Sequence, residues 1–493
     1  MGTLALCPPY DFPRPSRVAP TIPLNDTRHI IDLPRTGSSH NMTHDILCRA
    51  TAMSLDDHPT VRAVRARNSR EVDDAPVSAE LLKKIALACG ADDVGIIEFD
   101  RAAIAPQRDY IRKVYGRTRS LLAIACHMNR EPVRSPARSV ANEEFHGTYD
   151  HVNETGRAIV RALEQHGIPS CNAVAAFPME MDLPRIMMVQ HKPIAVEAGL
   201  GRMGIHRSVI HPKFGSFVLL GTILLGREVD AYDQPIDYNP CLECKLCVAA
   251  CPVGAIKPDG GFDFLSCHTH NYHDFLGNFA QWVEKVADSK DAKDYRARVP
   301  RTETLNIWQS LSFKPGYKAA YCISACPAGE DVIGPFLQDR DTHFADVVKP
   351  LIDKDELVYV IPDTDAEDTV TRRFPHKKIQ HVASGRHTGS IQAYIFSLSL
   401  GFQRGRARGL DLVTHLSFTG ATALELTVAI KGKDLKVTPG RHVGDAALRI
   451  TADTQAWLRV QNRDLELADA IDSQLVSPSD EGLFAAYMRC FPL

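Results

Sequence analysis

The chain has 493 residues, more than one hydrophobic core usually serves, which suggests about three domains. With 44% hydrophobic and 24% charged residues, its composition is that of a globular protein and excludes a disordered or fibrous one. The formal net charge of −3 gives no long-range field that would attract nucleic acid or an anionic membrane.

Residues 1–75 are rich in Pro, Arg, Asp and Ser and show no helical or strand period, which predicts a loosely ordered extension. Ordered structure is expected from Ser78, a suitable N-cap for a helix that Gly90 can end. The unit over 76–235 is predicted to be α/β or α+β. Its expected elements are a helix over 79–89, a strand over 94–99, a strand over 121–126, a helix over 153–165 and a strand over 217–225.

The stretch over 236–345 holds many Pro, Gly, Asp and Asn residues, which suit loops wrapped around inorganic centres rather than long regular elements. A polar Asp/Thr/Glu stretch follows, and we expect 346–375 to be a linker. Beyond it, 376–493 is predicted to be a separate α+β domain. Its expected elements are strands over 390–401, 413–419, 423–431 and 447–452 and a helix over 453–459.

The longest strongly apolar run, Phe217 to Gly226, is about half of what a membrane-spanning helix needs. No charged-then-apolar signal segment opens the chain. Seven of the 13 cysteines lie between Cys241 and Cys326 at ligand-like spacing, which indicates reduced thiolates. We therefore expect a cytoplasmic protein without a membrane span.

The string CLECKLCVAACP carries the strongest functional signal. It places Cys241, Cys244 and Cys247 at C-x2-C-x2-C spacing, followed by Cys251 and a proline. In bacterial ferredoxins such a run wraps three thiolates around one 4Fe–4S cubane, and the fourth cysteine crosses to a second cluster. Structural zinc is the main alternative, but zinc sites normally use paired C-x2-C units separated by a longer loop. The motif therefore predicts an iron–sulfur protein.

A second motif, YCISACP, supplies Cys322 and Cys326. Exchange of ligands between the motifs predicts one cluster on Cys241, Cys244, Cys247 and Cys326, and a second on Cys251, Cys267 and Cys322. Seven cysteines then serve eight positions, because Ala319 stands where a complete motif would have cysteine. The second cluster could take a histidine ligand, be a three-iron cluster, or keep an exchangeable site. The histidines nearest in sequence are His268, His270 and His273.

A glycine-rich element lies upstream, in the stretch KPIAVEAGLGRMGIHRSVIHPKFGSFVLLGTILL. Gly199, Gly201 and Gly204 fit the dinucleotide pattern G-x-G-x-x-G, but a helix end precedes them instead of the strand that the motif requires. We expect these glycines to let the backbone approach a bound group closely, with Arg202 and His206 beside an anionic or amide-bearing edge.

Together with the cysteine motifs, this stretch resembles the cobalamin-dependent reductive dehalogenases and the epoxyqueuosine reductases, over about 78–340. The resemblance implies an α+β fold with a nitroreductase-like corrinoid domain over 76–235 and a two-cluster ferredoxin-like module over 236–345. It also implies that cobalamin is a cofactor. The residues expected to contact it are Gly199, Gly201, Arg202, Gly204, His206, Gly215, Ser216 and Gly221.

The proton donor does not carry over directly from these families. Epoxyqueuosine reductases have an acidic residue shortly before the glycine element, where this chain has Arg185, with Asp182 three residues earlier. Dehalogenases use a tyrosine backed by a basic residue, a role that Tyr149 or Tyr321 could fill. A buried acid or a tyrosine beside a cation could each deliver a proton to a carbon centre. We name Tyr149 and Asp182 as the catalytic candidates.

The C-terminal domain resembles the sterol carrier protein fold, on the stretch LELTVAIKGKDLKVTPGRHVGDAALRITADTQAWLRVQNRDLELADAI. That resemblance implies an α+β fold that encloses an apolar tunnel for a fatty or steroidal ligand. A role in packing or dimerisation is the alternative, because enzymes also use this fold for those purposes.

The leading hypothesis is an enzyme, a reductase in which two clusters pass single electrons to a corrinoid that reduces a small organic substrate, halogenated or oxygenated. The second hypothesis is a cluster-only electron carrier or redox sensor with a lipid-binding module, and the third is epoxyqueuosine reduction on transfer RNA. Electrons would come from an external donor, a ferredoxin, a flavodoxin or their reductase. We do not expect nucleic acid as a partner.

Overall fold

The computed structural model describes residues 55–66, 75–180, 187–274, 278–384 and 388–492. The chain forms two compact units, Met1–Glu71 and Val72–Leu493. In the first unit, the described residues form the short helices η1 (Leu55–Asp57) and α2 (Pro59–Ala66). The rest of the predicted extension, except its last residue Ala75, lies outside the described residues.

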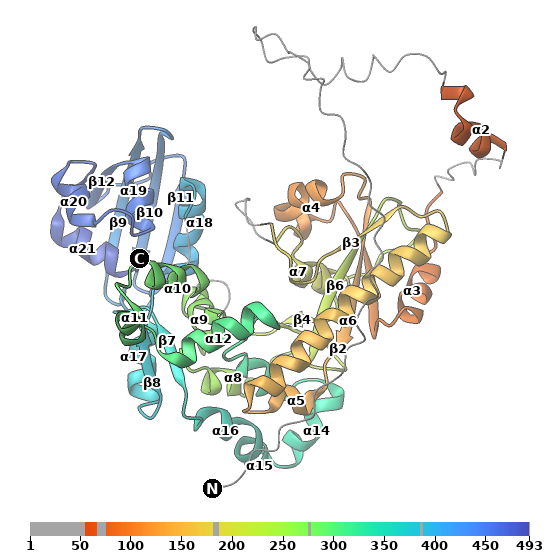
Figure 1. The fold of residues 1–493 in the computed structure, drawn as a ribbon, viewed down its shortest axis with the longest axis horizontal. Coiled ribbons are helices and arrows are strands. Elements are labelled where there is room, and N and C mark those ends of the chain that lie inside the picture. Colours follow the sequence, from red (N-terminus) through yellow and green to blue (C-terminus); the bar gives the residue numbers. More distant parts are fainter. Residues whose placement is uncertain (1–54, 67–74, 181–186, 275–277, 385–387, 493) are drawn as a thin grey trace, which may run out of the picture. The chain divides into compact units, whose positions relative to one another are not determined.

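The second unit begins with a four-stranded antiparallel sheet in the order β1-β2-β6-β3 (Figure 1). Its strands are β1 (Asp93–Glu98), β2 (Ser120–His127), β6 (Val218–Leu225) and β3 (Ser170–Ala173). Alternate residues of β2 pack into two separate cores: Leu122 and Ile124 into one, Leu121 and Ala123 into the other. Both faces of the sheet are therefore buried, which explains why its strands read as continuous apolar runs.

Helices cover both faces of this sheet. On one side lie α3 (Ala79–Ala88) and α6 (Arg138–Gln165), and on the other α4 (Arg108–Val114) and α7 (His191–Glu197). The predicted helix over 79–89 and the strands near 94–99, 121–126 and 217–225 are confirmed. The helix predicted over 153–165 is the second half of α6, which starts at Arg138 because His146, Thr148 and their neighbours on that helix pack against other segments of the chain.

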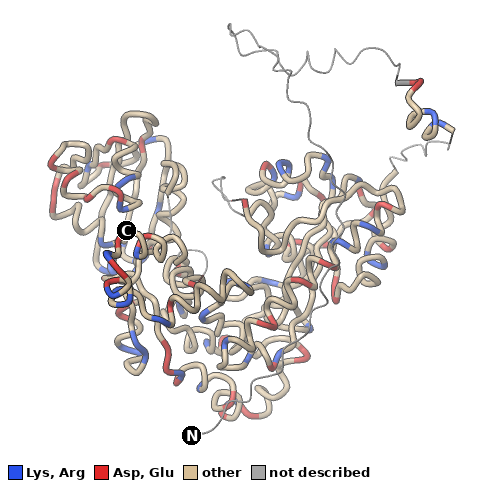
Figure 2. Tube along the Cα trace, viewed as in Figure 1, with Lys and Arg blue, Asp and Glu red and all other residues tan. Residues whose placement is uncertain are grey.

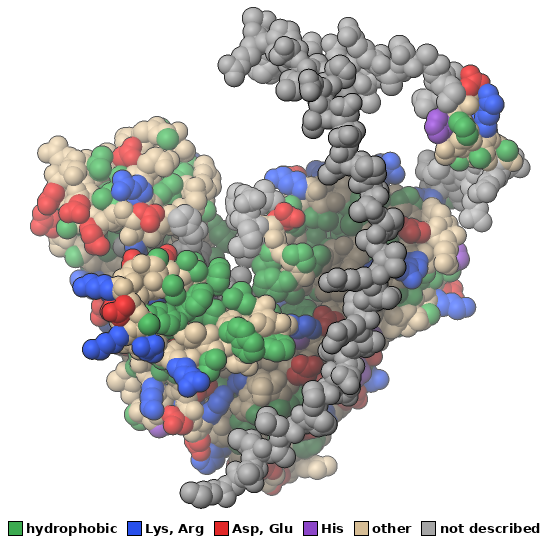
Figure 3. Space-filling model, in the orientation of Figure 1, with side chains coloured by type: hydrophobic (Ala, Val, Ile, Leu, Met, Phe, Trp, Pro, Cys, Tyr) green, Lys and Arg blue, Asp and Glu red, His purple; other side chains and the backbone are tan. Residues whose placement is uncertain are grey.

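The cysteine-bearing stretch follows the sheet. Short helices flank the cysteines: α8 (Leu246–Ala250), α9 (Phe264–Asn271), α13 (Tyr321–Ser324) and α14 (Glu330–Gln338). The expectation of loops is wrong between Cys267 and Cys322, where α10 (Asn278–Ala287), α11 (Ala292–Arg298) and α12 (Arg301–Ser312) form a helical insert. Figure 3 shows apolar side chains gathered on the surface over α10 and α12, among them Phe279, Trp308 and Phe313.

The stretch over 346–375, expected to be a linker, is instead packed structure. It contains α16 (Lys349–Ile352), β7 (Leu357–Val360) and α17 (Asp365–Arg373), and β7 pairs in parallel with β8 (Lys378–His381). Val358, Val370 and Phe374 share a core with Cys247 and Cys251. The polar residues that suggested a linker form the first turn of α17, where the negative charge of their carboxylates interacts favourably with the helix dipole. Ala366 in the same turn is buried.

The C-terminal domain holds a five-stranded sheet in the order β11-β10-β9-β12-β13. The central pair β9 and β12 is parallel, and the other pairs are antiparallel. The strands are β9 (Asp411–Thr419), β10 (Leu424–Lys431), β11 (Asp434–Pro439), β12 (Leu448–Asp453) and β13 (Val476–Pro478). The helices are α18 (Ile391–Gly401), α19 (Thr454–Gln461), α20 (Leu467–Asp472) and α21 (Glu481–Arg489). Trp457, Tyr394 and Tyr487 are buried in its core.

The strand predicted over 390–401 is wrong, because this segment forms helix α18. Its buried residues Ile391, Tyr394, Leu398 and Gly401 recur every three or four positions, which is the period of a helix face. Ser390 is the N-cap, and its hydroxyl accepts a hydrogen bond from the Ala393 N–H at 3.2 Å. The other predicted strands and the helix near 453–459 are confirmed. Among the described residues, no helix is long and apolar enough to cross a membrane.

The N-cap gives a test of the helical assignment of α18. Ser390→Ala removes the acceptor for the Ala393 N–H and should lower the free energy of opening of the first turn by about 1 kcal/mol, measured by amide hydrogen exchange. Ser399→Ala, on the exposed side of the same helix, is the matched control and should change exchange in that turn little. Equal effects of the two substitutions would contradict the cap.

Candidate iron–sulfur site

Four of the predicted ligands, Cys241, Cys244, Cys247 and Cys326, line one pocket. The chain can wrap around this pocket because Glu243 and Lys245 adopt the left-handed conformation, each with φ of 56°, before α8 begins. Pro240 and Ala328 complete the wall from the two cysteine loops, and Ile205 and His206 reach it from the sheet domain. The pocket is thus built by three separate segments.

Backbone N–H groups surround the sulfur atoms. The Ile205 N–H donates to Cys241 Sγ at 3.4 Å, and the Ala255 N–H donates to Cys251 Sγ at 3.2 Å. The Cys326 sulfur receives hydrogen bonds from the Ser216 hydroxyl and the Ala328 N–H, which lower its pKa against the larger effect of burial. Such donors stabilise thiolates and the sulfur ligands of iron–sulfur clusters.

The remaining three predicted ligands, Cys251, Cys267 and Cys322, interact with one another electrostatically. Burial raises the pKa of Cys267 well above its ordinary value, and the charges of Cys251 and Cys322 raise it further. Burial and the charge of Cys251 raise the pKa of Cys322 to about 12. Each of the two groups of thiols therefore takes cysteines from both motifs.

All described cysteines are free thiols. Among the described residues, no three His, Cys, Asp or Glu side chains lie close enough together to bind a single metal ion. In a cubane each cysteine binds a different iron, so its ligands are spread around the cluster rather than converging on one point. A pocket lined by four thiols fits that larger group.

The eighth ligand position is occupied by Ala319, which is buried beside Tyr321 and Leu351. Its N–H donates to Asn271 Oδ1 at 2.9 Å. Of the histidines proposed as ligands, His273 stacks on Tyr359 with ring centroids 3.6 Å apart, and His270 Nδ1 accepts the Tyr359 N–H. Both rings are engaged with strand β7 rather than with the thiols.

The third histidine, His268, lies directly after Cys267 on α9. Its ring packs against Phe264 and Tyr272, with centroids 5.6 and 5.5 Å away. Desolvation raises the pKa of Tyr272, and the charges of Cys267 and Cys322 raise it further. Tyr272, the C-cap residue of α9, therefore lies near Cys267 and Cys322.

The glycines of the upstream element pack against the chain itself. A Cβ atom on Gly201 would collide with the carbonyl oxygen of Ile210, and one on Gly199 would lie 2.8 Å from that of Gln234. A Cβ atom on Gly221 would lie too close to the side chains of Val152 and Ile124, and one on Gly204 would lie 2.7 Å from Ile210 Cδ1. Close packing inside the protein therefore explains why these positions are glycine, and their contact with a bound group stays a prediction.

Other residues of this element support the cysteine loops instead. Gly215 lies against Ala328, two residues after Cys326, at a distance that no side chain would allow. His206 is buried, and its Nε2 lies 3.0 Å from the Ser216 hydroxyl. Burial lowers the pKa of His206 to about 4, so the ring is neutral at pH 7. Arg202 is exposed.

The catalytic candidates have different surroundings. Tyr149 packs against the core beneath α6 and shares a hydrogen bond with Tyr317, and desolvation raises its pKa. Tyr321 is buried, and its hydroxyl donates to Glu356 at 2.6 Å. Asp182 and Arg185 lie outside the described residues.

Lys192 was not singled out from the sequence. Its Nζ donates to the Arg207 carbonyl at 2.6 Å. Desolvation lowers its pKa, and the charges of Cys322 and Cys267 act on it in the opposite sense. Lys192 is thus a cation at the junction between the glycine element and the second group of thiols.

Comparison with known proteins supports the iron–sulfur prediction. Residues 235–257 match the 4Fe–4S binding domain. An epoxyqueuosine reductase of Gloeobacter violaceus is 28% identical over 186 residues, which is 37% of this chain and 54% of the relative. One from Synechococcus sp. (strain RCC307) is 33% identical over 164 residues, or 33% of this chain and 48% of the relative. The chain thus spans about half the length of the curated relatives it matches.

Solved structures show weaker likeness. An epoxyqueuosine reductase from Streptococcus thermophilus aligns with a TM-score of 0.31 and 16% identity, covering 55% of this chain and 75% of that one. A catabolic reductive dehalogenase in complex with 3-bromo-4-hydroxybenzoic acid aligns with a TM-score of 0.33 and 15% identity, covering 50% and 38%. The sequence similarity to epoxyqueuosine reductases is confirmed over about a third of the chain, and the sterol-carrier resemblance stays a prediction.

The missing cysteine predicts two unequal clusters, the one on Cys251, Cys267 and Cys322 being the more labile. Ala319→Cys should make that cluster as robust as the other, because it supplies a thiolate at the aligned position. Iron content and electron paramagnetic resonance after brief exposure to air would measure this. Ala319→Ser, which adds an oxygen of similar size, is the control. Two equally robust, all-cysteine four-iron clusters in the unmodified protein would refute the ligand assignment.

Proposed function

We propose that this protein is an iron–sulfur reductase whose two clusters carry single electrons to a terminal acceptor in the sheet domain. One observation carries the proposal: the two groups of thiols draw on both motifs, and the sheet domain donates hydrogen bonds to the first group through Ile205 and Ser216. A module whose cysteine sulfur atoms accept hydrogen bonds from a neighbouring domain is close enough to that domain to exchange electrons with a group that it binds.

The finer proposal is that the acceptor is a corrinoid, as the resemblance to dehalogenases and epoxyqueuosine reductases implies. Close packing of the chain accounts for the glycines expected to contact it, and their role toward a corrinoid stays a prediction. Among the side chains of the same element, Arg202 is exposed and therefore accessible to such a group. When bound, a corrinoid supplies the metal-centred reduction of an organic substrate.

The names of the sequence relatives favour a specific second candidate, epoxyqueuosine reduction. A solved structure of that enzyme class holds an epoxyqueuosine-modified tRNA stem loop. This activity would make nucleic acid a partner, against our expectation from the net charge. The sequence relatives support this candidate best, and because the chain spans only about half of their length, it stands as a proposal beside the small organic substrate.

Reconstitution with cobalamin under reducing conditions tests the corrinoid proposal. Anaerobically purified protein should bind about one cobalt per chain beside its iron, measured by metal analysis and corrinoid absorbance. Arg202→Gln should lower cobalt content and leave iron unchanged, whereas Arg207→Gln, also exposed, should change neither. Full iron without stoichiometric cobalt would favour the electron-carrier alternative. Turnover of an epoxyqueuosine-modified stem loop, but not of bromophenols, would favour the second candidate.

We further propose that the C-terminal domain is a sterol-carrier-like fold that binds an apolar ligand. A pocket beside α18 supports this proposal. It lies between α9 and the domain, and is lined in part by Leu265, Tyr394, Leu398 and Phe491, with Ser397 and Gln461 among its polar residues. Burial of an acyl chain there would supply the driving force for binding.

The full-length protein should take up a fluorescent fatty acid with a roughly micromolar Kd, after association costs are deducted from apolar burial. Ser397→Trp, which fills the pocket, should abolish uptake, whereas Ser399→Trp, on the exposed side of α18, should not. Fluorescence titration measures both. No uptake by the unmodified protein, with no lipid retained in native mass spectrometry, would leave only a packing or dimerisation role.

A further inference from the structure

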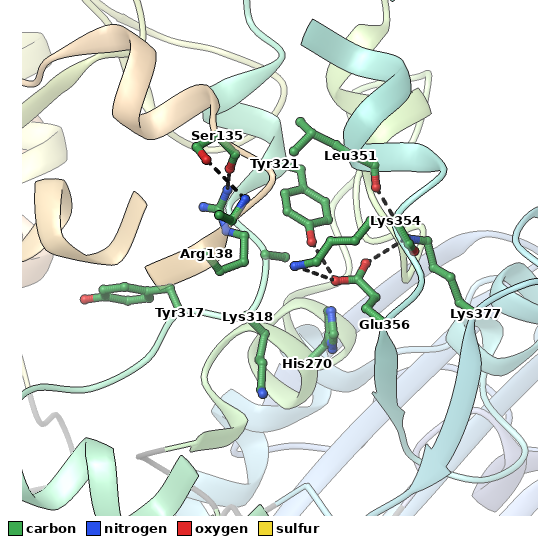
Figure 4. Close-up of polar contacts among 12 residues, drawn as sticks. Ser135, Arg138, His270, Tyr317, Lys318, Tyr321, Leu351, Lys354, Glu356 and Lys377 are labelled. Carbon is green, nitrogen blue, oxygen red and sulfur yellow. Dashed lines mark hydrogen bonds and ion pairs between the residues drawn. The ribbon is translucent and has the colours of Figure 1, made fainter. Parts of the chain in front are cut away.

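A buried ion group lies beside Tyr321 (Figure 4). At its centre is Glu356, whose side chain is 10% exposed. Lys377, with 1% of its side chain exposed, donates to Glu356 Oε1 at 2.7 Å. Lys354 Nζ lies 3.6 Å from Oε2, which also accepts the hydroxyl of Tyr321. Tyr321 immediately precedes Cys322 in the chain.

A third cation, Arg138, approaches the same tyrosine from helix α6. Its guanidinium carbon lies 5.1 Å from the centroid of the Tyr321 ring. Arg138 is 9% exposed, and its Nη1 donates to the Ser135 carbonyl at 3.0 Å. Its Nε and Nη2 are buried and have no hydrogen-bond partner among the described residues. An arginine with two unsatisfied donors in the interior requires an anion nearby.

The charges of this group do not balance. Arg138, Lys354 and Lys377 contribute three positive charges, and Glu356 contributes one negative charge, which leaves a surplus of two. A buried surplus of charge is costly unless a counter-charge lies close by. After Tyr321 and Glu356, Cys322 also acts on Arg138 electrostatically, so the second group of thiols and what they bind is a candidate for that counter-charge.

The first group of thiols has a different environment. Its neighbouring cation is Arg134, which interacts electrostatically with Cys326. Arg134 Nη1 lies 3.4 Å from Glu131 Oε1, and that carboxylate is 76% exposed and also pairs with Arg130. The Arg134 side chain is mostly buried, and its Nε and Nη2 have no hydrogen-bond partner among the described residues, as at Arg138. It is a single cation, however, and its carboxylate partner is exposed. The larger surplus of buried positive charge thus lies beside the second group.

We propose that Arg138, Lys354, Lys377 and Glu356 form a charge cradle that raises the reduction potential of the cluster on Cys251, Cys267 and Cys322 above that of the other cluster. This inference rests on the proposed function. The step it concerns is the transfer of one electron from an external ferredoxin or flavodoxin to the oxidised cluster, with no bond made or broken and no proton moved. Reduction adds one negative charge to the cluster. The cations stabilise that charge, so the electron is held preferentially by this cluster.

Substitutions of opposite sign test the cradle in the full-length, iron-loaded protein. In anaerobic redox titrations followed by electron paramagnetic resonance, Arg138→Gln should lower the potential of the second cluster and Glu356→Gln should raise it. Each should change the ratio of oxidised to reduced cluster at fixed potential about tenfold, which is about 59 mV for one electron. Arg138→Lys should retain most of the native potential. The first cluster, in the same sample, is the internal reference.

Lys349→Gln removes an exposed lysine that pairs with Asp353, and serves as the surface control without a shift. If Arg138→Gln does not fold, Lys377→Met should lower the same potential. Shifts of one sign in both the arginine and the glutamate variants, equal shifts in both clusters, or no shift with both clusters assembled would overturn the cradle. Protein without iron or cluster resonances would overturn the proposed function itself, before any potential could be measured.

Discussion

The crossing of two backbone segments at Gly215 and Gly329 is the contact on which the site depends. A side chain on either glycine would collide with the other loop. Next to the crossing, the Glu330 N–H donates to the Pro212 carbonyl at 2.9 Å and the Asp331 N–H to the Lys213 carbonyl at 3.0 Å. This ladder holds Cys326 beside Ser216 of the sheet domain, and so joins the sheet to the pocket of the first thiols.

The two groups of thiols share a plan but differ in their surroundings. Around the first group, the wall is made of loops and reaches the surface at Leu242 and Cys244. Around the second, Cys251, Cys267 and Cys322 share a core with Val358 and Phe374, and charged residues lie behind them. Figure 2 shows how Lys, Arg, Asp and Glu are otherwise distributed along the whole trace. Similar ligands in unlike environments are a general way of separating the properties of two clusters.

Features that depend on a short stretch of sequence could be predicted, and features that depend on contacts between distant residues could not. The strands β1, β2 and β6 are continuous apolar runs, and the cysteine motifs have fixed spacing, so both are legible in a short window. The purpose of the glycines could not be inferred, because Ile210, Gln234 and Ala328 approach them from elsewhere in the chain. The buried ion pairs of Lys354, Glu356 and Lys377 could not be predicted either, because these residues lie in a polar stretch that resembles a linker.

The order of the ligands along the chain has a consequence for biosynthesis. Cys326 belongs with Cys241, Cys244 and Cys247, and Cys322 belongs with Cys251 and Cys267, so both sets stay incomplete until the second motif has left the ribosome. Between the motifs, the helical insert α10 to α12 must emerge as well. On the proposed ligand assignment, iron and sulfide can therefore be inserted in full only after synthesis has passed Cys326, and a chain that stops before Cys322 lacks a ligand of each proposed cluster.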